Sequence, residues 1–331
     1  MDELDNYGVD LGMGGVKVFG PKKYIQLISQ VSVKTGYQVG RMSGLSTSQL
    51  PFQITLNSGN AFYVDINAHD FGRPIENMGM DRIASGSPET LALFYGAMTR
   101  MIQQTGEMTE PISVTCGLPI ETLSGEKTRG TIDSIQKWLK GEHTWKGNDK
   151  EYQINISEVK VTSQPAGALF DYTIDQSGET IPSHSISLNK ELGIISIGMN
   201  TLELLTVREK TPIQKFTKGS TSGVRRLLEM VNDQSLYSLG ELDSLLRSKK
   251  LDVSRVLPIW EREIIGEIEK CWGKSWHRFE SIILVGGGVL LLRNTLPSNF
   301  EGKAYIPDDP IFSIARGLWK LHLYQSIHKK G

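Results

Sequence analysis

Two similar glycine-rich segments carry residue types suited to binding phosphate. The first reads "DLGMGGVK" from Asp10, and the second reads "SIGMNTLE" from Ser196. A tight glycine turn between two strands exposes backbone N–H groups that can bind phosphate oxygens. The two segments differ in kind at their first position, because the first has a carboxylate there and the second has a neutral hydroxyl.

The first segment also supplies charged groups at useful positions. Asp10, at the end of a strand, could hold Mg²⁺ through the water shell of the ion. Lys17 lies on the returning strand and could contact phosphate as a point charge. We expect Gly12, Met13 and Gly14 to offer backbone N–H groups in the turn between them. The alternative is a plain glycine-rich hairpin with a surface lysine.

Two further turns could face the same ligand. The second hairpin turns at Gly198, Met199, Asn200 and Thr201, and a run of Gly286, Gly287 and Gly288 follows the apolar strand "ESIILV". Ligands of α/β proteins usually bind at the carboxyl ends of the strands, where this run lies. Ordinary turn chemistry is the alternative for both.

Gln164 stands between a predicted strand and a predicted helix, in the sequence "SQPAGA". A neutral amide there can orient a water molecule without acting as a strong base, as a glutamine does in some GTPases. Capping of the helix is the alternative. A Walker A motif is absent, because Ile268 stands where the "GKS" at Gly273 would need a glycine. The Rossmann fingerprint is absent as well, because Gly12 and Gly14 are not followed by a glycine at the required spacing.

Composition limits the possible partners. The chain has 331 residues and a net charge of −1, so it has no overall basic field that would attract nucleic acid or an anionic membrane. Cys116 and Cys271 do not form a metal-binding pair. No apolar run approaches the length of a membrane span. We therefore expect a cytoplasmic protein with no signal peptide, no membrane partner and no direct contact with nucleic acid.

Predicted strands and helices alternate along the chain, which indicates α/β layers. The similarity of the hairpins near residues 10 and 196 indicates a duplicated core. Strands are expected at 7–33, 52–57, 61–67, 111–119, 151–156, 158–164, 192–198, 201–209 and 280–288. Helices are expected at 88–105, 124–141, from 165, 223–232, 239–248, 253–272 and 309–327.

In this order along the chain, four segments resemble those of the actin-like ATPases, within the superfamily of actin, chaperones and sugar kinases. The resemblance is to the plasmid-segregating ParM and archaeal actin-like branch. "DLGMGGVK" is similar to its first phosphate loop, "SQPAGA" to its connecting segment, "SIGMNT" to its second phosphate loop and "LVGGGVLL" to its adenosine segment. "PDDPIFSIARGL" is similar to its closing helix.

The resemblance implies an α/β actin-like ATPase fold, with a duplicated ribonuclease-H-like core in two lobes around a nucleotide cleft. The first lobe would comprise residues 1–175 with 310–331, including a small subdomain at about 34–80, and the second lobe would comprise residues 190–309. ATP or ADP with Mg²⁺ would bind between them.

The resemblance also assigns roles to the candidate residues. Asp10 would orient the water shell of the metal, Lys17 would contact phosphate, and Gln164 would position the attacking water. The second loop would hold the γ-phosphate through Gly198, Asn200 and Thr201, and Gly286, Gly287 and Gly288 would lie on the adenosine side. A helix beginning near residues 219–223 would flank the base.

Ser196 departs from the family, which normally has aspartate at this position, facing the metal. Three interpretations remain open: a natural loss that slows hydrolysis, an engineered change that traps ATP, or a site re-formed with Glu203 or a water molecule. Removing one transition-state partner commonly lowers a rate by ~100-fold or more. We therefore expect nucleotide binding with slow turnover, with Ser196 still at the catalytic centre.

The expected function is that of a filament-forming ATPase in plasmid segregation or a prokaryotic cytoskeleton. The chain would polymerise with itself and move DNA through an adaptor protein. A nucleotide-sensing scaffold with little turnover and a small-molecule kinase are the alternatives, although Gln164 replaces the carboxylate base that a kinase needs. Residues 41–49 and the region of Trp272 and Trp276 are suggested as filament contacts, with core or ordinary surface roles as the alternative.

Overall fold

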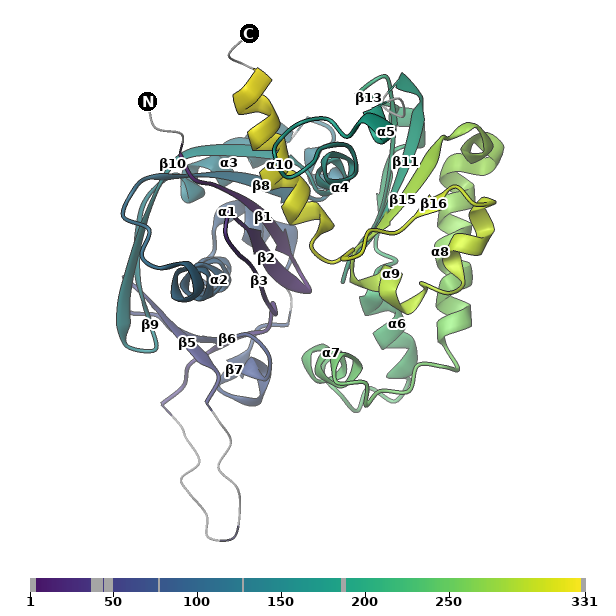
Figure 1. Ribbon diagram of the computed structural model, residues 1–331. Helices are drawn as coiled ribbons and strands as arrows, with labels where there is room; N and C mark the ends of the chain where they lie inside the picture. Colours follow the sequence, from purple (N-terminus) through teal and green to yellow (C-terminus); the bar gives the residue numbers. More distant parts are fainter. Residues whose placement is uncertain are drawn as a thin grey trace.

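The computed structural model describes residues 4–36, 44, 50–76, 78–126, 128–185 and 189–328. Two β-sheets divide these residues into two lobes that lie side by side (Figure 1). The first lobe is built on a ten-stranded sheet and the second on a six-stranded sheet. Residues 41–43 and 45–49, suggested above as filament contacts, lie outside the described residues.

The ten-stranded sheet has the strand order β3-β2-β1-β8-β10-β9-β5-β6-β4-β7. Its strands are β1 (Asn6–Gly12), β2 (Gly15–Phe19), β3 (Tyr24–Leu27), β4 (Val31–Val33), β5 (Phe52–Leu56), β6 (Ala61–Val64), β7 (Arg73–Pro74), β8 (Ile112–Leu118), β9 (Gly141–Gly147) and β10 (Lys150–Ser163). The six-stranded sheet has the order β13-β12-β11-β15-β16, and β14 also pairs with β12. Its strands are β11 (Glu191–Ile197), β12 (Leu202–Arg208), β13 (Thr211–Pro212), β14 (Lys218–Ser220), β15 (Ser281–Val285) and β16 (Ala304–Tyr305).

The helices connect these strands and cover the sheets. They are α1 (Met80–Ser85), α2 (Pro88–Thr105), α3 (Thr128–Leu139), α4 (Gln164–Thr173), α5 (Pro182–Ser185), α6 (Val224–Val231), α7 (Leu239–Arg247), α8 (Leu257–Trp272), α9 (Gly287–Leu291) and α10 (Ser313–His328). Short 3-10 turns include η1 (Ala68–Asp70), η2 (Ile120–Leu123), η4 (Gln214–Phe216), η5 (Gly273–Arg278) and η6 (Leu296–Phe300). No described helix is both long enough and apolar enough to cross a membrane.

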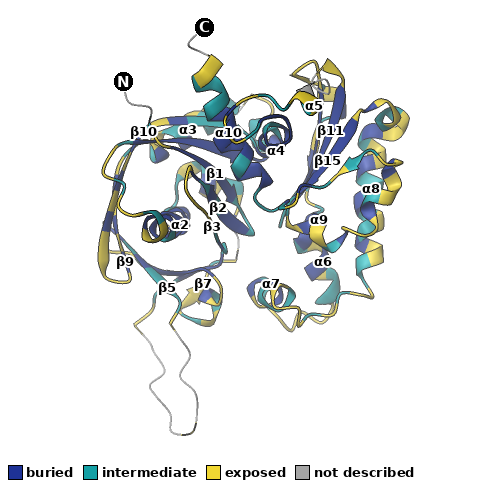
Figure 2. Ribbon diagram, viewed as in Figure 1, coloured by how far each residue is buried: buried dark blue, intermediate teal, exposed yellow. Residues whose placement is uncertain are grey.

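The core of each lobe repeats one strand arrangement, as the similar hairpins predicted. In the first lobe, β1 pairs antiparallel with β2 and parallel with β8. In the second lobe, β11 pairs antiparallel with β12 and parallel with β15. The strands β8, β11 and β15 are buried along their whole length, because helices or other strands cover both of their faces (Figure 2). The two hairpins therefore occupy corresponding positions in the two lobes.

Helix α2 lies inside the curve of the ten-stranded sheet (Figure 1). It begins after Ser87 with Pro88 in its first turn and ends before Gly106, as predicted. Gly106 has a φ of 94°, a backbone conformation that favours glycine. The side chain of Ser87 makes no capping bond to the backbone, and its hydroxyl lies 3.1 Å from the Thr90 hydroxyl instead.

Two sequence predictions around residues 141–164 were wrong in detail. Gly141, expected to end a helix, instead begins β9, which pairs with β10 across a turn at Asn148 and Asp149. Both turn residues have positive φ, 45° and 69°, as two-residue hairpin turns require. The two strands expected at 151–164 form one strand, β10, with an irregular register between Ile156 and Glu158.

Two predictions in the second lobe also needed correction. Helix α8 begins at Leu257 rather than near residue 253. Trp272, suggested as a filament contact, is only 1% exposed, and its indole N–H donates to the backbone oxygen of Phe216. Its position in the core follows from packing against Phe279, at a ring-centroid distance of 5.1 Å. Trp276 is half-buried and packs edge-on against Phe300.

Helices α4 and α10 cross between the two sheets (Figure 1). A β-carbon on Gly317 would lie 1.8 Å from the backbone oxygen of Gly167, so the two backbones touch directly. Beside this crossing, the carboxylate of Asp171 accepts hydrogen bonds from Arg316 and from Lys320. Burial acts to raise the pKa of Asp171, but the hydrogen bonds and charge of Arg316 and the charge of Lys320 hold it below the usual range. The crossing therefore joins the lobes by close packing and by a buried ion cluster.

Replacing Gly317 with alanine should destabilise the protein. The new methyl group would overlap the α4 backbone, and overpacking of this kind typically lowers the free energy of unfolding by about 1–3 kcal/mol or more. Urea denaturation measures the change. Gly266→Ala in α8 is the matched control, because nothing lies within 4 Å of its β-carbon position. This control should be neutral or stabilising by up to about 1 kcal/mol. Equal stability of both variants would contradict the close crossing.

Candidate functional site

A cavity of about 330 Å³ lies between the two lobes and is lined by both hairpins. The structure brings together every residue predicted for the site except Gly288. Those that line the cavity are Asp10, Gly12, Met13, Gly14, Lys17, Gln164, Ser196, Gly198, Met199, Asn200, Thr201, Gly286 and Gly287. Residues far apart in the sequence therefore meet in one place, as their positions at strand ends predicted.

Asp10 is held from two sides at the end of β1. Its Oδ2 atom lies 2.8 Å from Nζ of Lys17, the residue paired with it across β1 and β2. Its Oδ1 atom accepts a hydrogen bond of 2.8 Å from Nε2 of Gln164. Asp10 is only 2% exposed, so these two donors compensate a charge that is shielded from water.

Gln164 is the first residue of α4, directly after β10. Ser163 caps this helix by accepting a bond from the backbone N–H of Ala166, so helix capping does not account for Gln164. Since its amide nitrogen donates to Asp10, its amide oxygen is the atom that can accept a hydrogen bond from a water molecule. This is the geometry needed to orient a water beside Asp10.

The second hairpin carries different side-chain types at the corresponding paired positions. Ser196 pairs across β11 and β12 with Glu203, as Asp10 pairs with Lys17 across β1 and β2. The first hairpin therefore carries an acid opposite a cation, whereas the second carries a hydroxyl opposite an acid. Glu203 is 1% exposed and accepts a 2.6 Å hydrogen bond at Oε1 from the backbone N–H of Ile120.

The bond from Ile120 links the two lobes, because Ile120 follows β8 of the first lobe and Glu203 belongs to β12 of the second. Burial, together with the negative charges of Asp10 and Glu121, raises the pKa of Glu203 to about 8, against the hydrogen bond from Ile120. A carboxyl group with this pKa can exchange a proton near neutral pH, which ordinary surface glutamates cannot do. From the sequence, Glu203 was expected only as one way to re-form the site.

The three glycines after β15 differ in what they do. Gly286 has a φ of 95°, and a β-carbon there would lie 2.4 Å from the backbone oxygen of Ile197. Gly287 has open space at its β-carbon position and lines the cavity. Gly288 does not line the cavity, so its predicted place there was wrong. A β-carbon on Gly288 would lie 2.3 Å from Cγ2 of Ile197, and this residue therefore allows α9 to pack against β11.

One side of the cavity is apolar, and sequence analysis did not identify it. The apolar side chains come from α6, α7, α9, α10 and the segment before α10, and they are Val224, Leu246, Leu290, Leu291, Ile311 and Ile314. The helix expected near residues 219–223 begins at Val224, after Gly223 as its N-cap. Apolar residues scattered along helices carry no local motif, so only their meeting in the fold identifies this wall.

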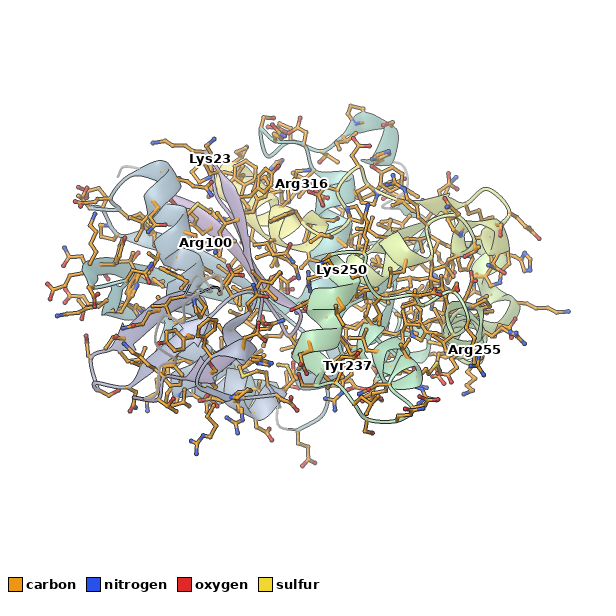
Figure 3. All side chains as sticks on the ribbon, turned by 90° about the horizontal axis from the view of Figure 1, so that it is seen from below. Lys23, Arg100, Tyr237, Lys250, Arg255 and Arg316 are labelled. Atoms are coloured by element: carbon orange, nitrogen blue, oxygen red, sulfur yellow. The ribbon has the colours of Figure 1, made fainter. Side chains whose placement is uncertain are left out.

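Helix α7 of the second lobe contacts the first hairpin at the mouth of the cavity. The guanidinium of Arg247 donates 2.9 Å to the backbone oxygen of Gly14 and also bonds Asp243. The side chain of Gln30 donates to the backbone oxygen of Gly240 and to the Ser244 hydroxyl, both at 2.9 Å. Figure 3 views this face, where Tyr237 and Lys250 flank α7. Asp243 and Arg247 line the cavity and were not predicted.

Comparison with known proteins identifies the fold. Residues 8–167 match the family model described as "Actin like proteins N terminal domain". No protein in the curated set matches the sequence significantly. Several solved structures match over nearly the whole chain with identities below 20%, a level at which the likeness establishes the fold alone.

Three of these structures represent the similarity. The archaeal actin homologue Ta0583 in complex with ADP is 18% identical, with a TM-score of 0.71 and coverage of 99% of this chain and 100% of the other. The 15-stranded ParM filament from Clostridium botulinum is 19% identical, with a TM-score of 0.70 and coverage of 98% and 99%. The apo psk41 parM protein is 16% identical, with a TM-score of 0.71 and coverage of 98% of both chains.

The stability of the protein should fall as pH rises, because of Glu203. The folded state keeps a proton on this group up to about pH 8, whereas the unfolded chain releases it near pH 4.5. This contribution is therefore fully present below about pH 4.5 and is lost as pH rises through about 8. Relative to the wild type, Glu203→Gln should gain stability across that interval, by a difference on the order of a few kcal/mol.

Urea denaturation at several pH values measures this difference between wild type and variant. Glu142→Gln is the matched control, because Glu142 is an exposed acid on β9 and is not among the charges that act on Glu203. Its stability difference from wild type should change little with pH. A pH-independent difference for Glu203→Gln would contradict the raised pKa.

Proposed function

Because the chain has the two-lobed actin-like ATPase fold, we propose that it is a filament-forming ATPase that binds Mg-ATP in the cavity between its lobes. The observation that carries the proposal is the meeting of two glycine-turn hairpins, one from each sheet, around Asp10, Lys17 and Gln164. The ADP complex of the archaeal relative and the ParM filament support nucleotide binding and self-assembly.

The residues fit a magnesium ion that is bound together with a nucleotide. Among the described residues, no group of three or more metal-binding side chains could hold an ion by itself. Mg²⁺ commonly uses one or two carboxylates together with phosphate oxygens and waters, and Asp10 supplies one such carboxylate. Bound magnesium would neutralise charge on the phosphate oxygens. The apolar wall opposite suits the flat face of a base.

Each protein group has a definite task in this proposal. The hairpin turns at Gly12–Gly14 and at Gly198–Thr201 present backbone N–H groups to the phosphates. Lys17, at the edge of the cavity, contributes positive charge. Gln164 orients the attacking water through its free amide oxygen. Ser196 brings no charge to the position where the family normally has aspartate, so turnover is slow.

We further propose that nucleotide binding holds the lobes together and that this closed form assembles into filaments. Hydrolysis then weakens the polymer. The role is in plasmid segregation or a prokaryotic cytoskeleton in the cytoplasm. The net charge of −1 favours attachment to DNA through an adaptor protein over direct contact, and the chain carries no basic field for a membrane.

Right-angle light scattering after addition of Mg-ATP tests the filament. Scattering should rise with Mg-ATP and stay flat without nucleotide. Asp10→Asn should abolish the rise, because it removes the charge that faces the metal, while Asp133→Asn, at an exposed site on α3, should retain it. A flat trace for the wild type over a wide range of protein concentration would reject polymerisation and favour the nucleotide-sensing scaffold or the kinase.

Ser196→Asp should accelerate hydrolysis. The substitution restores a charged oxygen ligand at the cavity wall, and a preorganised group of this kind contributes ~100-fold or more to a rate. Phosphate release at saturating Mg-ATP measures the effect, and Ser134→Asp on the exposed side of α3 is the control. Unchanged hydrolysis in Ser196→Asp would contradict slow turnover caused by the serine.

A further inference from the structure

Glu203 differs from every other buried acid that the structure describes. Seven acidic side chains are buried, and six of them have a Lys or Arg partner: Asp10, Asp65, Glu89, Asp171, Glu191 and Asp243. Glu203 has no cation beside it, and its Oε2 atom is buried without any hydrogen-bond partner among the described residues. A buried carboxyl with an unused oxygen is unfavourable for folding alone, which points to a role in function.

The position of Glu203 connects this oxygen to the cavity. Glu203 pairs directly with Ser196 across β11 and β12, and paired side chains on one face of a sheet have β-carbons about 4.5–5.5 Å apart. Ser196 lines the cavity, whereas Glu203 lies behind it and is not part of the lining. Ser196 is therefore the cavity-lining residue at the strand position paired with Glu203.

The other polar groups at this end of the cavity cannot readily accept a proton. Both oxygens of Asp10 accept hydrogen bonds, one from Lys17 and one from Gln164. The amide of Gln164 is not basic, and the amine of Lys17 is already a cation in its ion pair. Among the described residues, Glu203 is a buried carboxyl group near this end with an oxygen that has no hydrogen-bond partner.

We propose that Ser196 and Glu203 form a proton relay for ATP hydrolysis, in which Glu203 is the final acceptor. This inference rests on the proposed ATPase function. The oxygen of the water oriented by Gln164 forms a bond to the γ-phosphorus, and the bond from that phosphorus to the bridging oxygen of ADP breaks. ADP leaves with the electron pair of that bond. The water proton passes to Oγ of Ser196, whose own proton passes to Oε2 of Glu203.

The surroundings of Glu203 suit a base that works near neutral pH. Asp10 of β1 and Glu121 of η2 are the charged groups whose fields act on it, and both are negative. On its own sheet it faces Ser196 of β11 and Gly219 of β14, which carry no charge. Burial and these two acids keep its affinity for a proton high, and a base works best when its pKa lies near the operating pH.

The test compares the wild type with Glu203→Gln, Ser196→Ala and the control Glu142→Gln. Glutamine preserves the shape of Glu203 and an oxygen that accepts the bond from Ile120, but it takes up no proton. We expect Glu203→Gln to lower single-turnover cleavage of radiolabelled ATP by ~100-fold or more. It should also remove the dependence of the rate on pH that proton uptake by Glu203 would give the wild type. Ser196→Ala should be slower than wild type, and Glu142→Gln, at an exposed site on β9, should retain its rate.

Two measurements without turnover complete the test. Affinity for a non-hydrolysable ATP analogue should stay within about threefold in Glu203→Gln, since the group contacts no part of the nucleotide in this proposal. In the nucleotide-free wild type, the infrared band of a protonated carboxyl should disappear as pH rises through about 8, and Glu203→Gln should lack that band.

Different results would overturn the proton relay alone or the proposed ATPase function with it. Normal cleavage and a wild-type pH profile in Glu203→Gln would overturn the relay and leave the ATPase function intact. Cleavage of ATP by Ser196→Ala at the wild-type rate would overturn the role of the serine as the proton carrier. A wild type that binds the ATP analogue but never cleaves ATP would overturn the relay together with the proposed hydrolysis.

Discussion

The close crossing of α4 and α10 is the contact on which the arrangement of the two lobes depends. Gly167 and Gly317 let the helix backbones meet, and Gly8 lets α10 approach β1 in the same way, since a β-carbon there would lie 2.0 Å from the backbone oxygen of Ala315. The first residue of α4 is Gln164, so the crossing also fixes the amide that bonds Asp10. A small change in this packing would therefore move the Gln164 amide as well as the lobes.

The two hairpins have equivalent strand pairing but different side chains at the paired positions. Paired positions across each hairpin hold Asp10 with Lys17 in one lobe and Ser196 with Glu203 in the other. The first pair is neutral overall and stable when buried, because each charge has its partner within 2.8 Å. The second pair keeps an acid without a cation, so its charge depends on protonation. The asymmetry follows from side-chain identity alone, since the strand registers are equivalent.

The cavity joins a polar end, formed by the hairpin turns, to an apolar wall formed by helices of the second lobe and the segment before α10. Bonds from Arg247 to Gly14 and from Gln30 to Gly240 hold α7 against the first lobe at the mouth. The hydrogen bond from Ile120 to Glu203 also joins the lobes. A ligand that contacts both hairpins would add to these few polar links, which is a physical route from ligand binding to the relative position of the lobes.

The sequence by itself determined the elements whose signals are local. Glycine turns between apolar strands, Pro88 and Gly106 at the ends of α2, and the repeated hairpin pattern predicted the duplicated α/β core and nearly all the cavity residues that lie in turns. Only the tertiary structure decided what depends on contacts between distant residues. The burial of Trp272, the packing role of Gly288, the apolar wall, the contacts of α7 and the isolated carboxyl of Glu203 all arise from such contacts. A side chain acquires its burial, its partners and its pKa from neighbours that the fold brings to it, and no local pattern in the chain records them.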